Sequence, residues 1–329
     1  MRQEPRSNIN NILDQSISEL TKIDLKRHEF YYRTIDSNID LNFGIFGKDK
    51  IPCIGLCLNN KFIKYKIENK YKIITLMNAP SVYGERILIL LNSDDKIEIF
   101  KKLYNWLYQD LIENKNFIHS FEDLCKYVEE YSKFFEVKIK NFNNKESLLG
   151  LYGELDLLNE LLLSKKYTNR EVIDAWSGYQ RSTHDFNFLE NKIEVKSSTS
   201  DNNLIHCSSY NQLISHIGFN TYLIKFSYEE KSRKENGKNI SDLIDLIKRK
   251  LEISKTSLKI FERKLEIFGI DKLEDISRYI RKSYNIYEIR HDFPSFKDTN
   301  IHPSISGIKY KIDLSMCDEW MVPLSINEF

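Results

Sequence analysis

HDFNFLENKIEVK, residues 184–196, is the stretch that decides the fold of this chain. Its apolar and polar residues alternate as in two short strands, with a turn near Glu190. Residues two apart in a strand point to the same face, so Glu194 and Lys196 project together, and Asp185 on the paired strand can reach the same point. The stretch therefore predicts a β-hairpin that gathers two acids and a base, with the intervening residues facing the other way.

That grouping of charges indicates a metal site. Two carboxylates held about 4 Å apart repel by roughly 4 kcal/mol at an effective dielectric of 20, so they need a cation between them. Carboxylates together with the main-chain carbonyl of Val195 are hard oxygen ligands, which favour Mg²⁺, or Mn²⁺, over zinc. A cation on Asp185 and Glu194, with Lys196 beside it, suits hydrolysis of a phosphodiester. A solvated hairpin with a Glu/Lys pair is the alternative that the pattern alone leaves equally open.

Two partial copies of the motif show how much the context matters. HDF recurs at residues 291–293 and EVK recurs at residues 136–138, but only residues 184–196 hold both triplets. Neither copy supplies the paired acids of a metal site, so we expect neither to be catalytic.

Composition restricts the class of protein. With 329 residues, 41% of them apolar, the chain can bury a sizeable core in two domains or one elaborated domain. The net charge of +1 gives no overall attraction to nucleic acid but leaves room for a local basic face. The sequence lacks an apolar signal region and a run long enough to span a membrane, which predicts a protein neither exported nor membrane-spanning. Five scattered cysteines favour a reducing cytoplasm, with Cys53 and Cys57 packed in a strand rather than on zinc.

The order of elements predicts an α/β fold. Residues 39–92 hold short β-type runs, and helices are expected over 97–115 and 121–135. From 148 the pattern becomes a helix over 148–166 with Gly153 close to a sheet, a strand over 171–176, the hairpin, a helix over 208–217 and a strand over 219–228. This is an α-β-β-β-α-β core, and further helices (240–253 and 257–269) and β-type runs (284–293 and 307–314) follow it. We divide the chain into a β-rich N-terminal domain (1–115), a helical connection (116–147), the core (148–230) and a C-terminal α/β region packed on the core (231–329).

The chain resembles the PD-(D/E)xK phosphodiesterase superfamily, which has the restriction-endonuclease-like fold. Within it, the sequence is similar to a bacterial family of PD-(D/E)xK motif proteins from restriction and phage-defence gene clusters. The matching segments are GLYGELDLL at 150–158, DAWSG at 174–178, HDF at 184–186, EVKSS at 194–198 and SSYNQL at 208–213, with HDFPSF at 291–296 and GIKYKIDLSMCDEWMV at 307–322 extending the likeness.

The resemblance implies roles for particular residues. Asp185, Glu194 and Lys196 match the catalytic triad of the motif, although His184 replaces the usual proline before the aspartate. Glu154 matches the helix glutamate of many members, as an extra acid or metal ligand, and Gln212 matches a glutamine that positions substrate or catalytic groups. The nucleic-acid contacts that we expect come from residues near the motif: Arg181, His184, Ser197 and Ser198. His206 could also contact phosphate, whereas Trp176 is expected in the core.

These expectations together predict a Mg²⁺-dependent DNA endonuclease of a restriction or phage-defence system. Such an enzyme would act on double-stranded DNA as a homodimer, since one site of this type cuts one strand, and could work with other subunits of a defence gene cluster. Two alternatives remain: a catalytically silent DNA-binding or assembly subunit with a nuclease fold, and a nuclease that acts on RNA or on structured substrates.

Overall fold

The computed structural model describes residues 6–27, 29–36, 38–57, 73–79, 86–114, 118, 120–132, 134, 144–164, 166–177, 183–200, 202–215, 218–232, 236–270, 273, 277–296 and 307–329. These residues divide into two compact units, Met1–Val137 and Lys138–Phe329. The finer division at residues 115, 147 and 230 stays a prediction. Within the described chain, no helix combines the length and apolar character that a membrane crossing requires.

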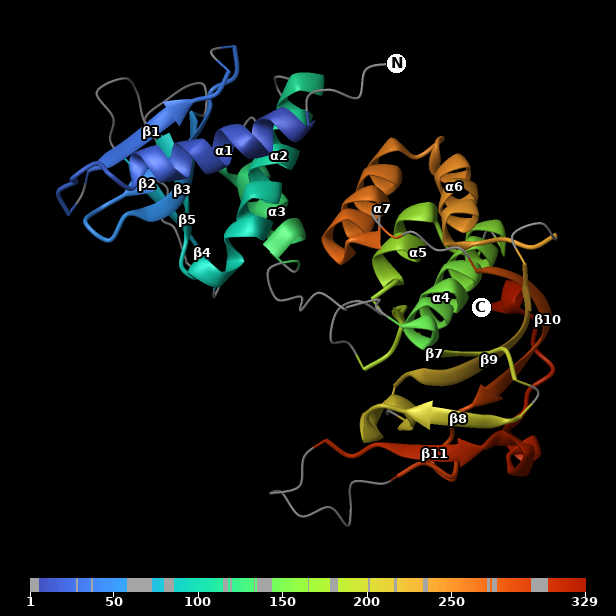
Figure 1. The fold of residues 1–329 in the computed structure, drawn as a ribbon. Coiled ribbons are helices and arrows are strands. Elements are labelled where there is room, and N and C mark those ends of the chain that lie inside the picture. The colour runs from blue at the N-terminus through green and yellow to red at the C-terminus, as the bar shows by residue number, and fades with distance from the viewer. Residues whose placement is uncertain are drawn as a thin grey trace. The chain divides into compact units, whose positions relative to one another are not determined.

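The first unit is an antiparallel sheet covered by helices (Figure 1). The sheet order is β1-β2-β3-β5-β4. Its strands are β1 (Phe30–Thr34), β2 (Leu41–Phe46), β3 (Ile51–Cys57), β4 (Ile74–Ala79) and β5 (Arg86–Leu91), and its helices are α1 (Arg6–Leu20), α2 (Ile97–Glu113) and α3 (Phe121–Ser132).

Aromatic side chains join the layers of this unit. The ring of Phe43 on β2 packs edge-on against Tyr104 of α2, with centroids 5.8 Å apart. Both Cys53 and Cys57 lie in β3, as predicted. The predicted β-type run KFIKYKI, residues 61–67, falls outside the described residues. Helix α1 was not anticipated, although Ile9, Leu13 and Leu20 recur at helical spacing and are buried.

The second unit has three layers: helices, a mixed sheet and a two-stranded ribbon (Figure 1). The sheet order is β10-β9-β7-β6, in which β7 and β9 are parallel and the outer pairs antiparallel. The strands of the unit are β6 (Phe186–Asn187), β7 (Asn191–Ser198), β8 (Leu204–Cys207), β9 (Asn220–Lys231), β10 (Arg278–Glu288) and β11 (Tyr310–Asp313); the helices are α4 (Lys145–Ser164), α5 (Asn169–Ala175), α6 (Ile240–Leu251) and α7 (Lys255–Phe268). The fold is α/β, as the sequence predicts.

The faces of this sheet have different coverings. Helix α4 packs on β7, with α5, α6 and α7 around it. On the opposite face lies the ribbon of β8 and β11, and a buried apolar cluster joins the ribbon to the sheet. The cluster includes Ile205 and Ile312 from the ribbon and Leu223 and Tyr287 from β9 and β10. This burial keeps the ribbon fixed beneath the sheet.

Two predicted elements of the core were wrong. Residues 171–176, expected as a strand, form most of helix α5, and only Trp176 makes an isolated bridge, to Phe186. The reason is a capping box: the Thr168 side chain accepts from the Glu171 backbone, while the Glu171 side chain accepts from the Thr168 backbone. This signal outweighs the β-propensity of Val172 and Ile173.

The helix predicted over 208–217 is also wrong. Its described residues, 208–215, form a 3₁₀ turn at Tyr210–Leu213 in place of an α-helix; the Ser209 side chain accepts a bond from the Asn211 backbone, and Leu213 is fully buried. Serine and asparagine compete with helical hydrogen bonds in this way.

Candidate active site

The predicted hairpin is present and has one long arm. Strands β6 and β7 pair antiparallel, with Phe186 opposite Ile193, and the turn closes through a 2.8 Å bond from the Phe188 amide to the Asn191 carbonyl. Because β6 has two residues and β7 has eight, β7 runs on past the end of its partner. Among the described strands, none pairs with residues 195–198 on this side, so the edge of β7 is open there.

Asp185 lies at that open edge. Its Oδ2 accepts a 2.8 Å hydrogen bond from the Val195 amide, and its own carbonyl accepts from the Ser177 amide at 2.7 Å. The N–H and C=O of one strand residue point to the same edge. The carbonyl of Val195 therefore lies on the side of the strand where Asp185 sits.

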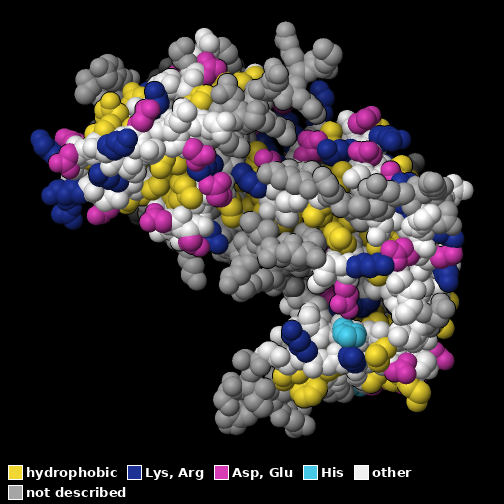
Figure 2. Space-filling model, in the orientation of Figure 1, with side chains coloured by type: hydrophobic (Ala, Val, Ile, Leu, Met, Phe, Trp, Pro, Cys, Tyr) yellow, Lys and Arg dark blue, Asp and Glu magenta, His cyan; other side chains and the backbone are white. Residues whose placement is uncertain are grey.

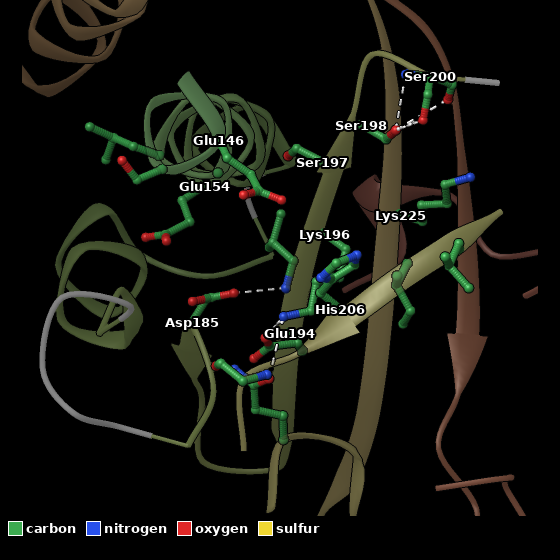
Figure 3. Close-up of a pocket in the computed structure, with 18 of the residues that line it drawn as sticks. Glu146, Glu154, Asp185, Glu194, Lys196, Ser197, Ser198, Ser200, His206 and Lys225 are labelled. Carbon is green, nitrogen blue, oxygen red and sulfur yellow. Dashed lines mark hydrogen bonds and ion pairs between the residues drawn. The ribbon is translucent and has the colours of Figure 1, made fainter. Parts of the chain in front are cut away.

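Glu194 and Lys196 project from the face of β7 opposite helix α4. Val195 and Ser197 are the residues that meet α4, at Gly153, so the alternation is as predicted. The Lys196 ammonium donates to Glu194 Oε1 at 2.6 Å, and the Glu194 side chain is only 2% exposed. Figure 3 shows Asp185, Glu194 and Lys196 converging around the strand.

The electrostatics of this group are unusual. Burial, with a further contribution from the Asp185 carboxylate, raises the pKa of Glu194 from 4.5 to about 8, although Lys196 acts to lower it and Glu154 to raise it. Burial alone would lower the pKa of Lys196, but Glu194 and Asp185 reverse this and raise it. Strong pKa perturbation by burial together with a charged partner is typical of functional sites.

Glu154 approaches from helix α4, on the other face of the sheet. Its Oε2 accepts a 2.9 Å hydrogen bond from the indole Nε1 of Trp176, which is fully buried, as predicted for a core residue. The backbone carbonyl of Trp176 in turn accepts from the ammonium of Lys264 at 2.8 Å. Glu154 is therefore held by the side chain of a residue whose backbone is bound to α7.

Gln212 contacts Lys196. Its Oε1 accepts from the Ser208 amide at 2.9 Å and from the Lys196 ammonium at 3.4 Å. The 3₁₀ turn thus places the glutamine where the predicted helix was expected to place it. The contact favours a role in orienting Lys196.

One cavity of about 570 Å³ unites these residues. Its lining includes all the predicted catalytic and metal-binding residues: Glu154, Asp185, Glu194, Val195, Lys196 and Gln212. The remaining lining is mostly polar and includes Asn144, Glu146, Ser147, Ser198, Ser200, Asn202, His206 and Lys225.

The predicted nucleic-acid contacts are divided. Ser197 and Ser198 line the cavity, and so does His206. His184 is buried and is not among the residues that line the cavity. Its carbonyl accepts a hydrogen bond from Ser177 Oγ at 3.2 Å. Arg181 lies outside the described residues.

Lys225 is a site residue that sequence reasoning missed. It stands in register with Lys196 on the neighbouring strand, and its ammonium donates to the Asn202 carbonyl at 2.9 Å and to Asn203 Oδ1 at 2.7 Å. The lysine is 3% exposed. A single lysine within the otherwise apolar run YLIKF was the available signal, because lysine is seldom buried without a partner.

Of the two partial motif copies, only HDF at residues 291–293 lies in the described part of the chain, and it is not part of the cavity. Asp292 accepts a 3.1 Å bond from the Trp320 indole at the surface. Residues 136–138 lie outside the described part of the chain.

The donor set fits a hard divalent cation held in part by solvent. Among the described residues, no group of three or more His, Cys, Asp or Glu side chains has the geometry of a metal centre. Asp185 and Glu194 nevertheless interact, since the Asp185 charge adds to the effect of burial in raising the pKa of Glu194, and Val195 offers a carbonyl at the same edge. Two carboxylates and one carbonyl suit Mg²⁺, which keeps several of its waters in proteins.

A comparison with protein families places the chain in a known family. Residues 16–315 match the model of the family described as "Putative PD-(D/E)XK family member, (DUF4420)". The chain belongs to this family. Searches of the curated proteins and of the solved structures found no match.

Family membership assigns meaning to the hairpin. Asp185, followed by Glu194-Val195-Lys196, has the form of the motif that the family is named for, and the assignment of these residues to its positions stays a prediction. The match covers both units of the chain, so the β-rich first unit is part of the family architecture and not an unrelated addition. The nuclease-like fold and the superfamily predicted from the sequence are both confirmed.

Proposed function

We propose that this protein is a metal-dependent DNA endonuclease, the nuclease component of a restriction or phage-defence system. The observation that carries the proposal is the convergence of Asp185, Glu194 and Lys196 on one cavity at the open edge of β7. A buried acid pair raises the free energy of the folded state unless a cation or proton neutralises it. A retained acid pair with an adjacent lysine supports a working hydrolytic site.

The residues of the cavity would have separate roles in metal binding and catalysis. Asp185, Glu194 and the Val195 carbonyl would hold Mg²⁺ or Mn²⁺, with Glu154 reaching the cation directly or through water. The cation would supply stabilisation of the charge that develops on the scissile phosphate. Lys196 would position the attacking water or stabilise phosphoryl charge, and its 3.4 Å contact with Gln212 would orient it.

Further residues near the motif are proposed to contact the backbone of the substrate. Ser197, Ser198 and Arg181 are the proposed backbone contacts, and serine hydroxyls are common ligands of DNA phosphates. Cleavage of both strands would need two such sites, so we expect a homodimer, which analytical ultracentrifugation can measure. Double-stranded DNA is the substrate that we propose, with other subunits of a defence gene cluster as partners.

The test is Mg²⁺-dependent cleavage of plasmid DNA by the full chain. Asp185→Ala and Lys196→Ala should each lower the cleavage rate by at least 100-fold, a loss on the order of 3 kcal/mol in transition-state stabilisation. Asp245→Ala and Lys255→Ala change the same residue types at exposed positions of α6 and α7 and are the matched controls. Thermal melting would confirm that all four variants fold. Cleavage retained by both site variants would exclude this hydrolytic assignment.

One contact favours the catalytically silent alternative. The 2.6 Å ion pair between Lys196 and Glu194 occupies an acid that a metal would need. A subunit of that kind would shift DNA in a salt-dependent manner and leave it uncut with Mg²⁺ and with Mn²⁺. Competition between DNA and RNA of the same sequence would separate the DNA endonuclease from an RNA nuclease.

A further inference from the structure

The ribbon of β8 and β11 carries basic side chains on its outer face. Lys311 stands directly opposite His206 in the antiparallel register, so the two side chains share a face. Both are exposed, as is Lys309, which immediately precedes β11. In Figure 2, a histidine and Lys or Arg side chains gather over β8 and β11.

These three side chains have no acidic partner within the described chain. No hydrogen bond or ion pair engages the side chains of Lys309, Lys311 or His206 there. Asp313 is the acid nearest along β11, but its Oδ1 is occupied by the amide and hydroxyl of Ser315 at 3.0 and 2.7 Å. The face is therefore electropositive and free to meet an external anion.

The opposite face of the ribbon is rigidly held. Ile205 and Cys207 of β8, with Ile312 of β11, lie in the apolar cluster that includes Leu223 of the central sheet. Cations mounted on a packed two-stranded element keep their positions better than cations on a loop. The ribbon is thus a fixed platform and not a mobile arm.

The ribbon also borders the proposed active site. Leu204, His206 and Ser208 line the same cavity as Asp185 and Glu194. Figure 3 shows His206 on its strand beside Lys196. A polyanion whose scissile phosphate sat at the open edge of β7 would have its flanking phosphates near this face.

We infer that the basic face of the β8–β11 ribbon, formed by His206, Lys309 and Lys311, binds the phosphate backbone of duplex DNA next to the cut site. This inference rests on the proposed function. Flexible ammonium groups neutralise phosphates without reading bases, so the ribbon sets the register of the DNA and not its sequence preference. The role accounts for two unpaired lysines beside a cavity whose described acids would otherwise repel DNA.

The salt dependence of binding provides the test. Each phosphate contact to B-DNA contributes a slope of about −0.9 in the logarithm of the binding constant against the logarithm of salt concentration. Lys309→Gln/Lys311→Gln should therefore reduce the slope by about 1.8 and weaken binding up to roughly 60-fold at 0.1 M salt. Binding of the full chain to a fluorescent DNA duplex, in EDTA to prevent cleavage, gives both quantities.

Two double variants act as controls. Arg249→Gln/Lys255→Gln removes the same charge from exposed positions on α6 and α7 and should leave the slope nearly unchanged. Lys309→Arg/Lys311→Arg keeps the charge and should retain the wild-type slope. The inference would be overturned if the two Gln variants lost equal DNA affinity and salt slope, or if the ribbon variant lost neither. DNA binding by the wild-type protein would remain in both cases. Wild-type protein that bound no duplex at 50 mM salt would instead overturn the proposed function, and the inference with it.

Discussion

Replacing Glu194 by glutamine should make the protein more stable and inactive. The pKa of this buried carboxyl is raised from 4.5 to about 8, chiefly by burial and then by Asp185. A raised folded-state pKa means that the folded protein must hold a proton which the unfolded chain releases. Stability from this group is therefore lost as pH rises from about 4.5 to about 8, and glutamine removes that dependence.

The size of the effect follows from the pKa values. At pH 7 the proton uptake costs about 3.4 kcal/mol, whereas at pH 5 it costs about 0.8 kcal/mol. The stability advantage of Glu194→Gln over wild type should therefore grow by up to about 2.6 kcal/mol between these pH values. The change with pH is the diagnostic quantity, because any difference in packing between Glu194 and glutamine adds only a term that does not vary with pH.

Guanidinium unfolding in EDTA, repeated from pH 5 to pH 8, measures this difference. Glu190→Gln removes the same charge from the exposed turn of the same hairpin and serves as the matched control. With Mg²⁺ in place of EDTA, wild type and Glu190→Gln should each gain about 1.4 kcal/mol of stability at ten times the Kd, whereas Glu194→Gln should gain little. A stability difference between wild type and Glu194→Gln that stayed constant with pH would refute the electrostatic reasoning.

Two further substitutions test how the site is supported. Trp176→Phe removes the Nε1–H that donates to Glu154 at 2.9 Å, so it should raise the Mg²⁺ concentration needed for half-maximal cleavage. The control is Tyr152→Phe, which removes a 3.3 Å hydrogen bond from another residue of α4 and should leave that concentration unaltered. Unaltered Mg²⁺ dependence in Trp176→Phe would argue against a positioning role. Gly153→Ala should destabilise the protein by about 1–3 kcal/mol because the added Cβ would overlap Ser197 Oγ. Adding Ser197→Ala to this variant should recover the lost stability. Gly150→Ala, with no atom within 4 Å of the added Cβ, should instead stabilise by about 0.5–1 kcal/mol, and chemical denaturation compares all three.

Local pattern was a good guide wherever the relevant contacts were close in sequence. The hairpin, the shared face of Glu194 and Lys196 and the approach of Gly153 to the sheet all follow from strand and helix periodicity. Convergence of Asp185 on the same cavity also follows, because a turn of three residues leaves the paired strand few alternatives. The catalytic roles of these residues remain predictions.

Pattern failed where a local signal was misread. The Thr168–Glu171 capping box was present in the sequence, and its recognition would have predicted helix α5 in place of a strand. The 3₁₀ turn before Ile214 has a similar origin, since the Ser209 and Gln212 side chains accept hydrogen bonds from the backbone amides of Asn211 and Ser208. These errors moved elements without displacing Gln212 from the site.

By itself, the sequence determined which side chains could do chemistry and that three of them would share one hairpin, because strand alternation acts over two residues. Only the tertiary structure decided the surroundings that tune them: the bond from Trp176 to Glu154, the placement of Lys225 beside Lys196, and the pairing of residues 204–207 with 310–313. Those contacts join segments separated by 22 to more than 100 positions. Their partners are selected by burial and packing of the whole unit, which no local period in a single sequence encodes.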